Sequence, residues 1–220
     1  MNAVYPIPRN IASDSIAEYP LKRILDFVFA SLAFVLSLPL WVIFALAIKA
    51  EDGGPVLYRQ KRWGKDKKPI DVYKFRSMVV DADKKCGVVQ AQENDPRVTR
   101  VGQFLRATSL DEIPQILNIW KGEMSWVGPR ALPINEVQIR EEGGYIPDEA
   151  IPGFDLRCKV RPGLTGMAQV YAPRDVPRRH KFRYDLIYIR NQSLCLDAKL
   201  IALSFWITLR GTWERRGKKF

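Results

Sequence analysis

Residues 27 to 48 read FVFASLAFVLSLPLWVIFALAI, a run of 22 residues without a charged side chain. At 1.5 Å per residue, a straight helix of this length would be about 33 Å long, which is enough to cross a bilayer. Pro39 interrupts the run. Because proline removes a backbone donor and clashes with the preceding turn, we expect a kink there. The segment decides the class of fold, since a chain built around it meets a membrane.

Cations flank this apolar run on both sides. Lys22 and Arg23 precede it, and Lys49, Arg59, Lys61 and Arg62 follow it. A spanning helix normally has its positive excess on one side only. The residues alone leave two topologies open: a kinked single span with a cytoplasmic domain behind it, or a helix-break-helix that enters one leaflet and returns.

The composition limits the possible partners and metals. The chain carries 35 Lys and Arg against 24 Asp and Glu, a net charge of +11, which indicates nucleic acid, an anionic membrane surface or phosphorylated substrates. Three scattered cysteines and one histidine indicate a reducing compartment without a zinc site. Any metal would therefore be a hard cation with oxygen ligands.

The rest of the chain predicts an α+β fold that is predominantly helical. Short β-prone runs at 55–60 and 70–77 flank a turn and predict a small β-hairpin. We expect an irregular loop over 133–156. Helices are expected at 97–107, from about 109–111 to 120, at 178–191 and at 194–213. The last helix joins aromatic and basic residues, which suits an interfacial helix on an anionic leaflet as well as a core helix with a solvated basic tail.

Two adjacent carboxylates, Asp111 and Glu112, lie in the segment RATSLDEIPQILNIW, residues 106 to 120. Ser109 and Glu112 fit a capping box, the interpretation that spacing alone favours. However, with Ser109 as N-cap, Pro114 would fall at the fifth helical position, where a backbone donor is expected. With a later cap, both carboxylates lie at the helix N-terminus, where free N–H groups keep an aspartate ionised. Such a carboxylate suits phosphoryl chemistry if cations gather around it.

Candidate cations are present at several places. Lys74 and Arg76 alternate onto one face of the second predicted strand, and Arg106 precedes the carboxylates by five residues. Arg130 in VGPRA and Arg161 in RPGLTG lie in rigid turn contexts. A single arginine near a turn is usually a surface ion-pair partner, but the combination indicates an anion site.

The chain resembles the bacterial monotopic phosphoglycosyl transferases, the sugar transferases that initiate capsule, O-antigen, exopolysaccharide and glycoprotein glycan assembly. The resemblance extends from about Leu21 to Leu209. In chain order, its blocks are KRILDFVFASLAFVLSLPLWVIFALAIK, GPVLYRQKRWG, YKFRSM, DPRVTRVGQFLRATSLDEIPQILNIWKGEMSWVGPR, RPGLTGMAQV and SLCLDAKL. The block SLDEIPQ followed by a Gly-Pro-Arg turn is highly specific, and it outweighs the capping interpretation.

The resemblance implies an enzyme of the bacterial cytoplasmic membrane, with its active site facing the cytoplasm. It would transfer a sugar 1-phosphate from a UDP-sugar to polyprenol (undecaprenyl) phosphate and release UMP, as a first membrane step of exopolysaccharide or lipopolysaccharide synthesis. By similarity, Asp111 would attack the β-phosphorus and carry a covalent phosphosugar. Mg²⁺ beside Asp111 would neutralise diphosphate charge. Glu112 would either position groups in the active site or take part in proton transfer.

The resemblance also implies roles for other residues. The expected substrate-binding residues are Lys74, Arg76, Arg106, Arg130, Arg174 and Asp197. Arg174 replaces the family arginine only if its loop absorbs one extra residue. The family's hydrophobic segment is a re-entrant helix-break-helix, broken at a Ser-Pro pair. Here Ser37 and Pro39 are separated by Leu38, so any bond from the hydroxyl to a freed carbonyl needs a different geometry.

Three parts follow from this interpretation: an N-terminal extension (1–20), a re-entrant membrane helix (21–50) and a membrane-associated cytosolic catalytic domain (51–220) with amphipathic interfacial helices. The rival interpretation is a membrane-anchored basic binding or scaffold protein without catalysis. We expect no nucleic-acid partner, because the basic stretch 59–68 contains one aromatic residue, Trp63, and no nucleic-acid-binding fold signature appears. The identity of the UDP-sugar and a homo-oligomeric state stay open.

Overall fold

The computed structural model describes residues 16–80, 82, 95–134, 146–173 and 176–210. Over these residues the chain is an α+β fold with helices in the majority, as expected. Most of the expected N-terminal extension, Arg174 and the basic tail 211–220 lie outside the described residues.

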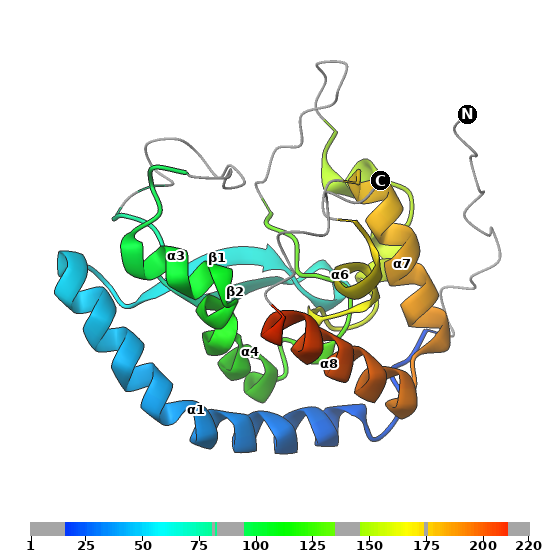
Figure 1. Ribbon diagram of the computed structural model, residues 1–220. Helices are drawn as coiled ribbons and strands as arrows, with labels where there is room; N and C mark the ends of the chain where they lie inside the picture. Colours follow the sequence, from blue (N-terminus) through cyan, green and yellow to red (C-terminus); the bar gives the residue numbers. More distant parts are fainter. Residues whose placement is uncertain (1–15, 81, 83–94, 135–145, 174–175, 211–220) are drawn as a thin grey trace.

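The apolar run forms one long helix, α1, from Lys22 to Asp52. The chain stays helical through Pro39, and Figure 1 shows the helix bending in its middle, so the expected kink is confirmed. All the other elements lie on one side of α1 (Figure 1), and its outer face is bare. Several of its large apolar side chains are more than half exposed, among them Leu32, Val35, Leu36, Val42 and Leu46. By length and composition, α1 could cross a membrane.

Ser37 makes its own contacts at the bend. The carbonyl that Pro39 leaves without its usual donor is that of Val35, four residues earlier. Ser37 Oγ donates instead to the Phe34 carbonyl at 3.0 Å and accepts from Trp41 Nε1 at 3.2 Å. Ser37 therefore binds the Phe34 carbonyl, which is the neighbour of the Val35 carbonyl that Pro39 leaves without a donor.

The predicted hairpin is confirmed, with shifted boundaries. Strand β1 (Leu57–Trp63) pairs antiparallel with β2 (Pro69–Phe75). The 3₁₀ turn η2 (Lys65–Lys67) joins them. Phe75 is buried on β2 and meets the Trp41 ring of α1 edge-on, at 5.2 Å between centroids. The hairpin thus packs against the second half of the apolar helix.

The predicted helices are confirmed as α3 (Arg100–Ala107), α7 (Arg178–Asn191) and α8 (Leu194–Leu209). The segment after Ser109 begins as a 3₁₀ helix, η3 (Leu110–Gln115), and continues as α4 (Ile116–Lys121). Pro114 lies inside the 3₁₀ part, and the regular α-helix begins two residues after it. The expected helix is confirmed in its extent, but its first part is a 3₁₀ helix, because the proline cannot supply the hydrogen bond of a regular α-helix.

Several short elements had no clear signal in the sequence. β3 (Ser125–Val127) pairs in parallel with β4 (Gly163–Thr165). Part of the predicted loop over 133–156 is helical, as η4 (Asp148–Ala150) and the beginning of α5 (Phe154–Arg157). α6 (Met167–Tyr171) follows β4. The paired strands need small residues, since a Cβ on Gly163 would lie 2.0 Å from the Gly128 nitrogen.

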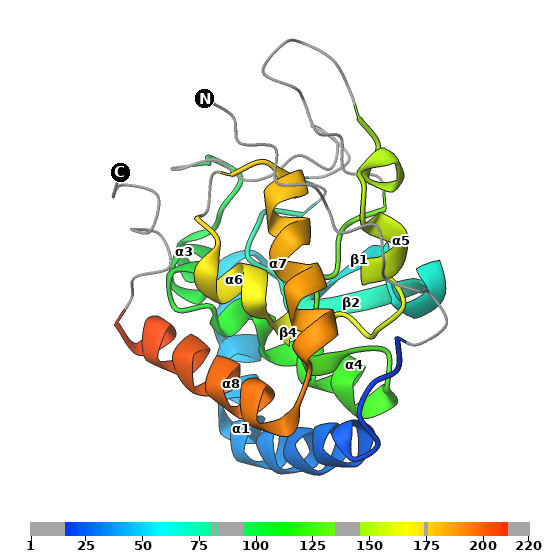
Figure 2. The ribbon, with the colours of Figure 1, turned by 90° about the vertical axis from the view of Figure 1, so that its right-hand side faces the viewer.

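Buried polar contacts fasten the first half of α1 to the rest of the fold. Asp26 Oδ1 accepts from Ser125 Oγ at 3.0 Å and from the Trp126 amide at 3.1 Å. Arg23 donates to the last carbonyls of α4, those of Ile119 and Trp120. In Figure 2, α4 and α8 both lie next to α1. The long helix is therefore docked along one face and open along the other.

Candidate active site

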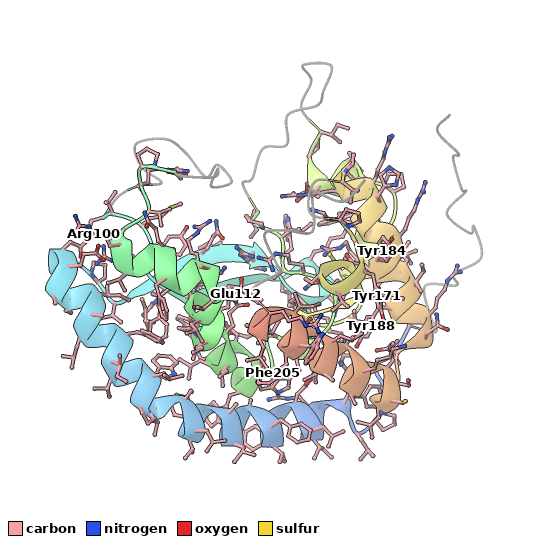
Figure 3. The ribbon with its side chains drawn as sticks, viewed as in Figure 1. Arg100, Glu112, Tyr171, Tyr184, Tyr188 and Phe205 are labelled. Atoms are coloured by element: carbon pink, nitrogen blue, oxygen red, sulfur yellow. The ribbon has the colours of Figure 1, made fainter. Side chains whose placement is uncertain are left out.

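Asp111 and Glu112 lie in the first turn of η3, facing strand β2. Lys74 on β2 connects them: its Nζ is 2.7 Å from Glu112 Oε1 and 3.4 Å from Asp111 Oδ2. Asp111 is buried. Figure 3 shows Glu112 between the hairpin and α4, in the middle of the molecule. The structure thus brings together the two predicted catalytic carboxylates and one predicted cation.

The capping box that spacing alone favoured is not formed. Ser109 precedes η3 with φ 58°, and its side chain makes no cap hydrogen bond. Its backbone carbonyl accepts from the Glu112 amide instead. A left-handed backbone conformation is uncommon for serine, and such conformations cluster at functional sites. Glu112 therefore takes no part in a capping box, and both carboxylates contact Lys74. The helix begins directly after Ser109 rather than after a later cap residue, and both carboxylates lie in its first turn, as expected.

Burial and neighbouring charges separate the two carboxylates electrostatically. Burial raises the pKa of Asp111; Lys74 and Arg106 oppose that rise, and Glu112 adds to it. Burial acts on Glu112 in the same direction, but Lys74 and Arg130 outweigh it, so the pKa of Glu112 is lowered. The pair therefore holds one firmly ionised carboxylate beside one that is costly to ionise, a pattern common at functional sites.

Further cations border the pair. Arg130 Nη2 is 3.3 Å from Glu112 Oε1, and the Arg130 side chain is 46% exposed. Arg106 on α3 acts on Asp111 through charge alone. Arg62 on β1 was not predicted as a site residue, yet its charge helps to lower the pKa of Glu112. In the sequence, only the position of Arg62 in the basic run of the hairpin could have pointed to it.

Arg76 and Arg161 do not join this group. Arg76 forms a two-pronged ion pair with Asp52 at the end of α1 and also donates to the Pro55 carbonyl. Arg161 pairs with Glu18 and donates to the Gly122 carbonyl. These contacts do not bring Arg76 together with Lys74: Arg76 lies just beyond β2, and its guanidinium holds the end of the long helix.

Asp197 lies in a second buried cluster, apart from the carboxylate pair. Its Oδ2 is 2.5 Å from Lys22 Nζ, its Oδ1 accepts from Tyr188 Oη at 2.7 Å, and Tyr19 Oη donates to Oδ2 at 2.9 Å. Glu112 and Tyr188 are separate in Figure 3. These contacts join the beginning of α1 to α7 and α8, so Asp197 has a structural role in this geometry.

The carboxylate pair fits Mg²⁺ in its chemistry. Among the described residues, no group of three or more His, Cys, Asp or Glu side chains gathers as a metal site. Mg²⁺ is commonly held by one or two carboxylates, with water and substrate phosphates completing its shell. The charge of Asp111, which burial makes costly, would be stabilised by such an ion.

This geometry suits the transfer of phosphorylated groups beside a membrane, and comparison with known proteins defines the class. Residues 17–211 match the bacterial sugar transferase family. The chain belongs to that family of transferases, which confirms the resemblance that its sequence blocks carry.

The chain is also similar in sequence to curated proteins. The chain is 44% identical to the exopolysaccharide production protein PSS of Rhizobium leguminosarum bv. phaseoli, over 82% of this chain and 91% of the relative. It is 46% identical to a UDP-glucose:undecaprenyl-phosphate glucose-1-phosphate transferase of Klebsiella pneumoniae, over 83% and 39%. An Escherichia coli K12 protein of the same name is 45% identical, over 93% and 43%. The chain thus spans most of the first relative and under half of the other two.

Proposed function

We propose that this protein transfers a sugar 1-phosphate from a UDP-sugar to polyprenol phosphate, releases UMP, and does so through a covalent phosphosugar on Asp111. One observation carries the proposal: a buried aspartate in the first turn of η3 lies next to an ionised glutamate and shares a lysine with it. Family membership and the names of the relatives support it.

In the first step, an Asp111 carboxylate oxygen bonds to the β-phosphorus of the UDP-sugar. The bond from that phosphorus to the bridging oxygen breaks, and the oxygen leaves with its electron pair on UMP. In the second step, an oxygen of polyprenol phosphate attacks the same phosphorus, and the Asp111 carboxylate leaves. Splitting the transfer in this way means that two anionic substrates need not occupy the site together.

The chain's cations suit this chemistry. Lys74 lies close enough to Asp111 to stabilise negative charge on the carboxylate and then on the transferred phosphate. Arg130 and Arg106 supply positive charge for the diphosphate. Glu112 keeps Lys74 and Arg130 in place through its own contacts. Mg²⁺ bound at Asp111 would supply Lewis-acid neutralisation of the diphosphate.

We also propose that α1 enters and leaves the cytoplasmic leaflet as a re-entrant segment bent at Pro39, in the bacterial inner membrane. The bend, the bare outer face of α1 and the position of the hairpin against its second half support this topology. Cysteines introduced near residues 2 and 60 should both be labelled from the cytoplasmic side. Labelling from opposite sides would establish a spanning helix instead.

UMP release tests the transfer. Membranes or detergent-solubilised full chain should release UMP with polyprenol phosphate and one member of a UDP-sugar panel. The panel should start with UDP-glucose, the sugar nucleotide in the names of the Klebsiella pneumoniae and Escherichia coli relatives. Asp111→Asn should abolish the release, whereas Asp155→Asn, at an exposed ion pair with Lys67, should retain it. A binding or scaffold protein would release no UMP in either form.

A further inference from the structure

A buried guanidinium lies behind the proposed active site. Arg157, the last residue of α5, has a side chain that is 3% exposed. Its Nε donates to Asp185 Oδ2 of α7 at 3.0 Å, and its Nη2 donates to the backbone carbonyl of Arg130 at 2.6 Å. One side chain therefore joins α7 to the turn from which Arg130 reaches toward Glu112.

The same turn is held from the opposite side by the hairpin. Arg62 Nη1 donates to the Ala131 carbonyl at 2.8 Å. The Trp63 amide donates to the Leu132 carbonyl at 2.9 Å. Two guanidinium groups from separate parts of the chain thus bind consecutive carbonyls. The backbone at Arg130 has little freedom to move relative to the carboxylate pair.

Apolar packing holds Arg157 in this orientation. The Phe182 ring centroid is 4.7 Å from Arg157 Cζ. Phe182 belongs to a buried cluster with Phe154 and Leu132, and Leu132 lies two residues after Arg130. A planar guanidinium stacked on a ring is held more firmly than an ammonium would be.

We propose that Arg157, aligned by Asp185, is a positioning residue that sets the Arg130 guanidinium between Glu112 and the phosphates of the substrate. The inference rests on the proposed function, because the place of Arg130 matters only if the site binds a phosphorylated substrate. The hydrogen bonds of Arg157 go to Asp185 and to the Arg130 backbone carbonyl, so it acts through the Arg130 backbone.

The Arg157→Lys variant distinguishes the positioning of Arg130 from the neutralisation of the buried Asp185 carboxylate. Burial raises the pKa of Asp185, and Arg157 opposes the rise, so a neutral residue at 157 would leave a buried carboxylate uncompensated. Lysine keeps the positive charge. It has a single nitrogen, however, and cannot donate to Asp185 and to the Arg130 carbonyl with the geometry of the guanidinium fork.

The test is a double-mutant cycle on kcat/KM for the UDP-sugar, measured by UMP release. Arg157→Lys should lower kcat/KM about tenfold, mainly through a higher KM, because a misplaced guanidinium binds phosphate poorly. In an Arg130→Ala background, Arg157→Lys should have almost no further effect, since there is no guanidinium left to position. An equal tenfold loss in both backgrounds would overturn the proposal.

Arg178→Lys is the matched control. Arg178 also forms a buried ion pair, with Asp148, and links η4 to α7. Any effect of Arg178→Lys on kcat/KM should be the same with and without Arg130. If Arg157→Lys does not fold, Asp185→Asn takes its place in the cycle and should show the same loss of effect in the Arg130→Ala background. A wild-type chain without UMP release overturns the proposed function and this role together, whereas an active chain with an additive cycle overturns this role alone.

Discussion

Lys74 Nζ lies 2.7 Å from Glu112 Oε1 and 3.4 Å from Asp111 Oδ2, so one ammonium group serves both carboxylates. Its side chain is 18% exposed, which keeps water from screening these interactions fully. Lys74 lowers the pKa of each carboxylate against the effect of burial. Lys74 therefore connects β2 of the hairpin to Asp111 through electrostatics rather than through the backbone.

Lys74→Met should lower UMP release about 100-fold, the size of effect seen when one preorganised donor at a developing charge is removed. Lys74→Arg should retain more activity than Lys74→Met, because the charge remains. The control is Lys61→Met on the same hairpin, whose side chain is 72% exposed and lies 3.7 Å from Asp71. Lys61→Met should stay close to wild type. Near-normal activity in Lys74→Met would show that the cation is not needed.

The pH dependence of the reaction follows from the raised pKa of Asp111. The attacking carboxylate must be ionised, so kcat/KM should fall as the pH drops through a pKa above the usual value of about 3.9. Lys74 lowers this pKa, so Lys74→Arg should leave the acid limb near its wild-type position, whereas Lys74→Met should move it to higher pH. An acid limb that stays in place or moves to lower pH in Lys74→Met would contradict the assignment.

Asp111→Asn should leave the folded protein at least as stable as wild type. The folded-state pKa of Asp111 is raised, so its ionisation opposes folding: the cost builds up as the pH rises from the usual aspartate pKa to the raised one, and it is fully present at higher pH. Replacing it with a neutral amide removes this cost. Thermal unfolding in detergent at pH 7 measures the effect. A clearly lower Tm would mean that Asp111 is a structural residue of the kind that caps a helix.

Asp197→Asn should act on stability rather than on substrate affinity. The change removes the carboxylate charge that contacts the buried Lys22 ammonium, and breaking such a buried pair costs about 3–5 kcal/mol. Thermal unfolding should show this loss, while the KM for the UDP-sugar in the folded fraction should stay within about twofold of wild type. Asp71→Asn, at a half-exposed position, is the control. A raised KM with unchanged stability would restore a substrate-binding role for Asp197.

Residue type and order predicted the large features of the fold because each depends on local properties. The apolar run, the bend at Pro39 and the hairpin follow from hydropathy and turn chemistry. The strands β3 and β4 are three residues long and carry no periodic pattern, so only their pairing across the fold reveals them.

The candidate site was predictable in part. Asp111, Glu112 and Lys74 lie together as the sequence blocks indicate. The partners of the other charges were not visible in the spacing: Arg76 pairs with a residue 24 positions away, and Asp197 with one 175 positions away. Whether an arginine binds substrate or holds two elements together is decided by such distant partners. The role of Arg157 in particular depends on contacts with two other segments.

The most direct test of the account is to look for the phosphosugar on the protein itself. The full chain is mixed with the active UDP-sugar and without polyprenol phosphate, quenched, and analysed by intact-mass and peptide mass spectrometry. We expect one sugar phosphate per chain, on the peptide that contains Asp111. We also expect polyprenol phosphate to remove the adduct and Asp111→Asn to form none. UMP release that continues in Asp111→Asn, with no adduct on either protein, would contradict this account.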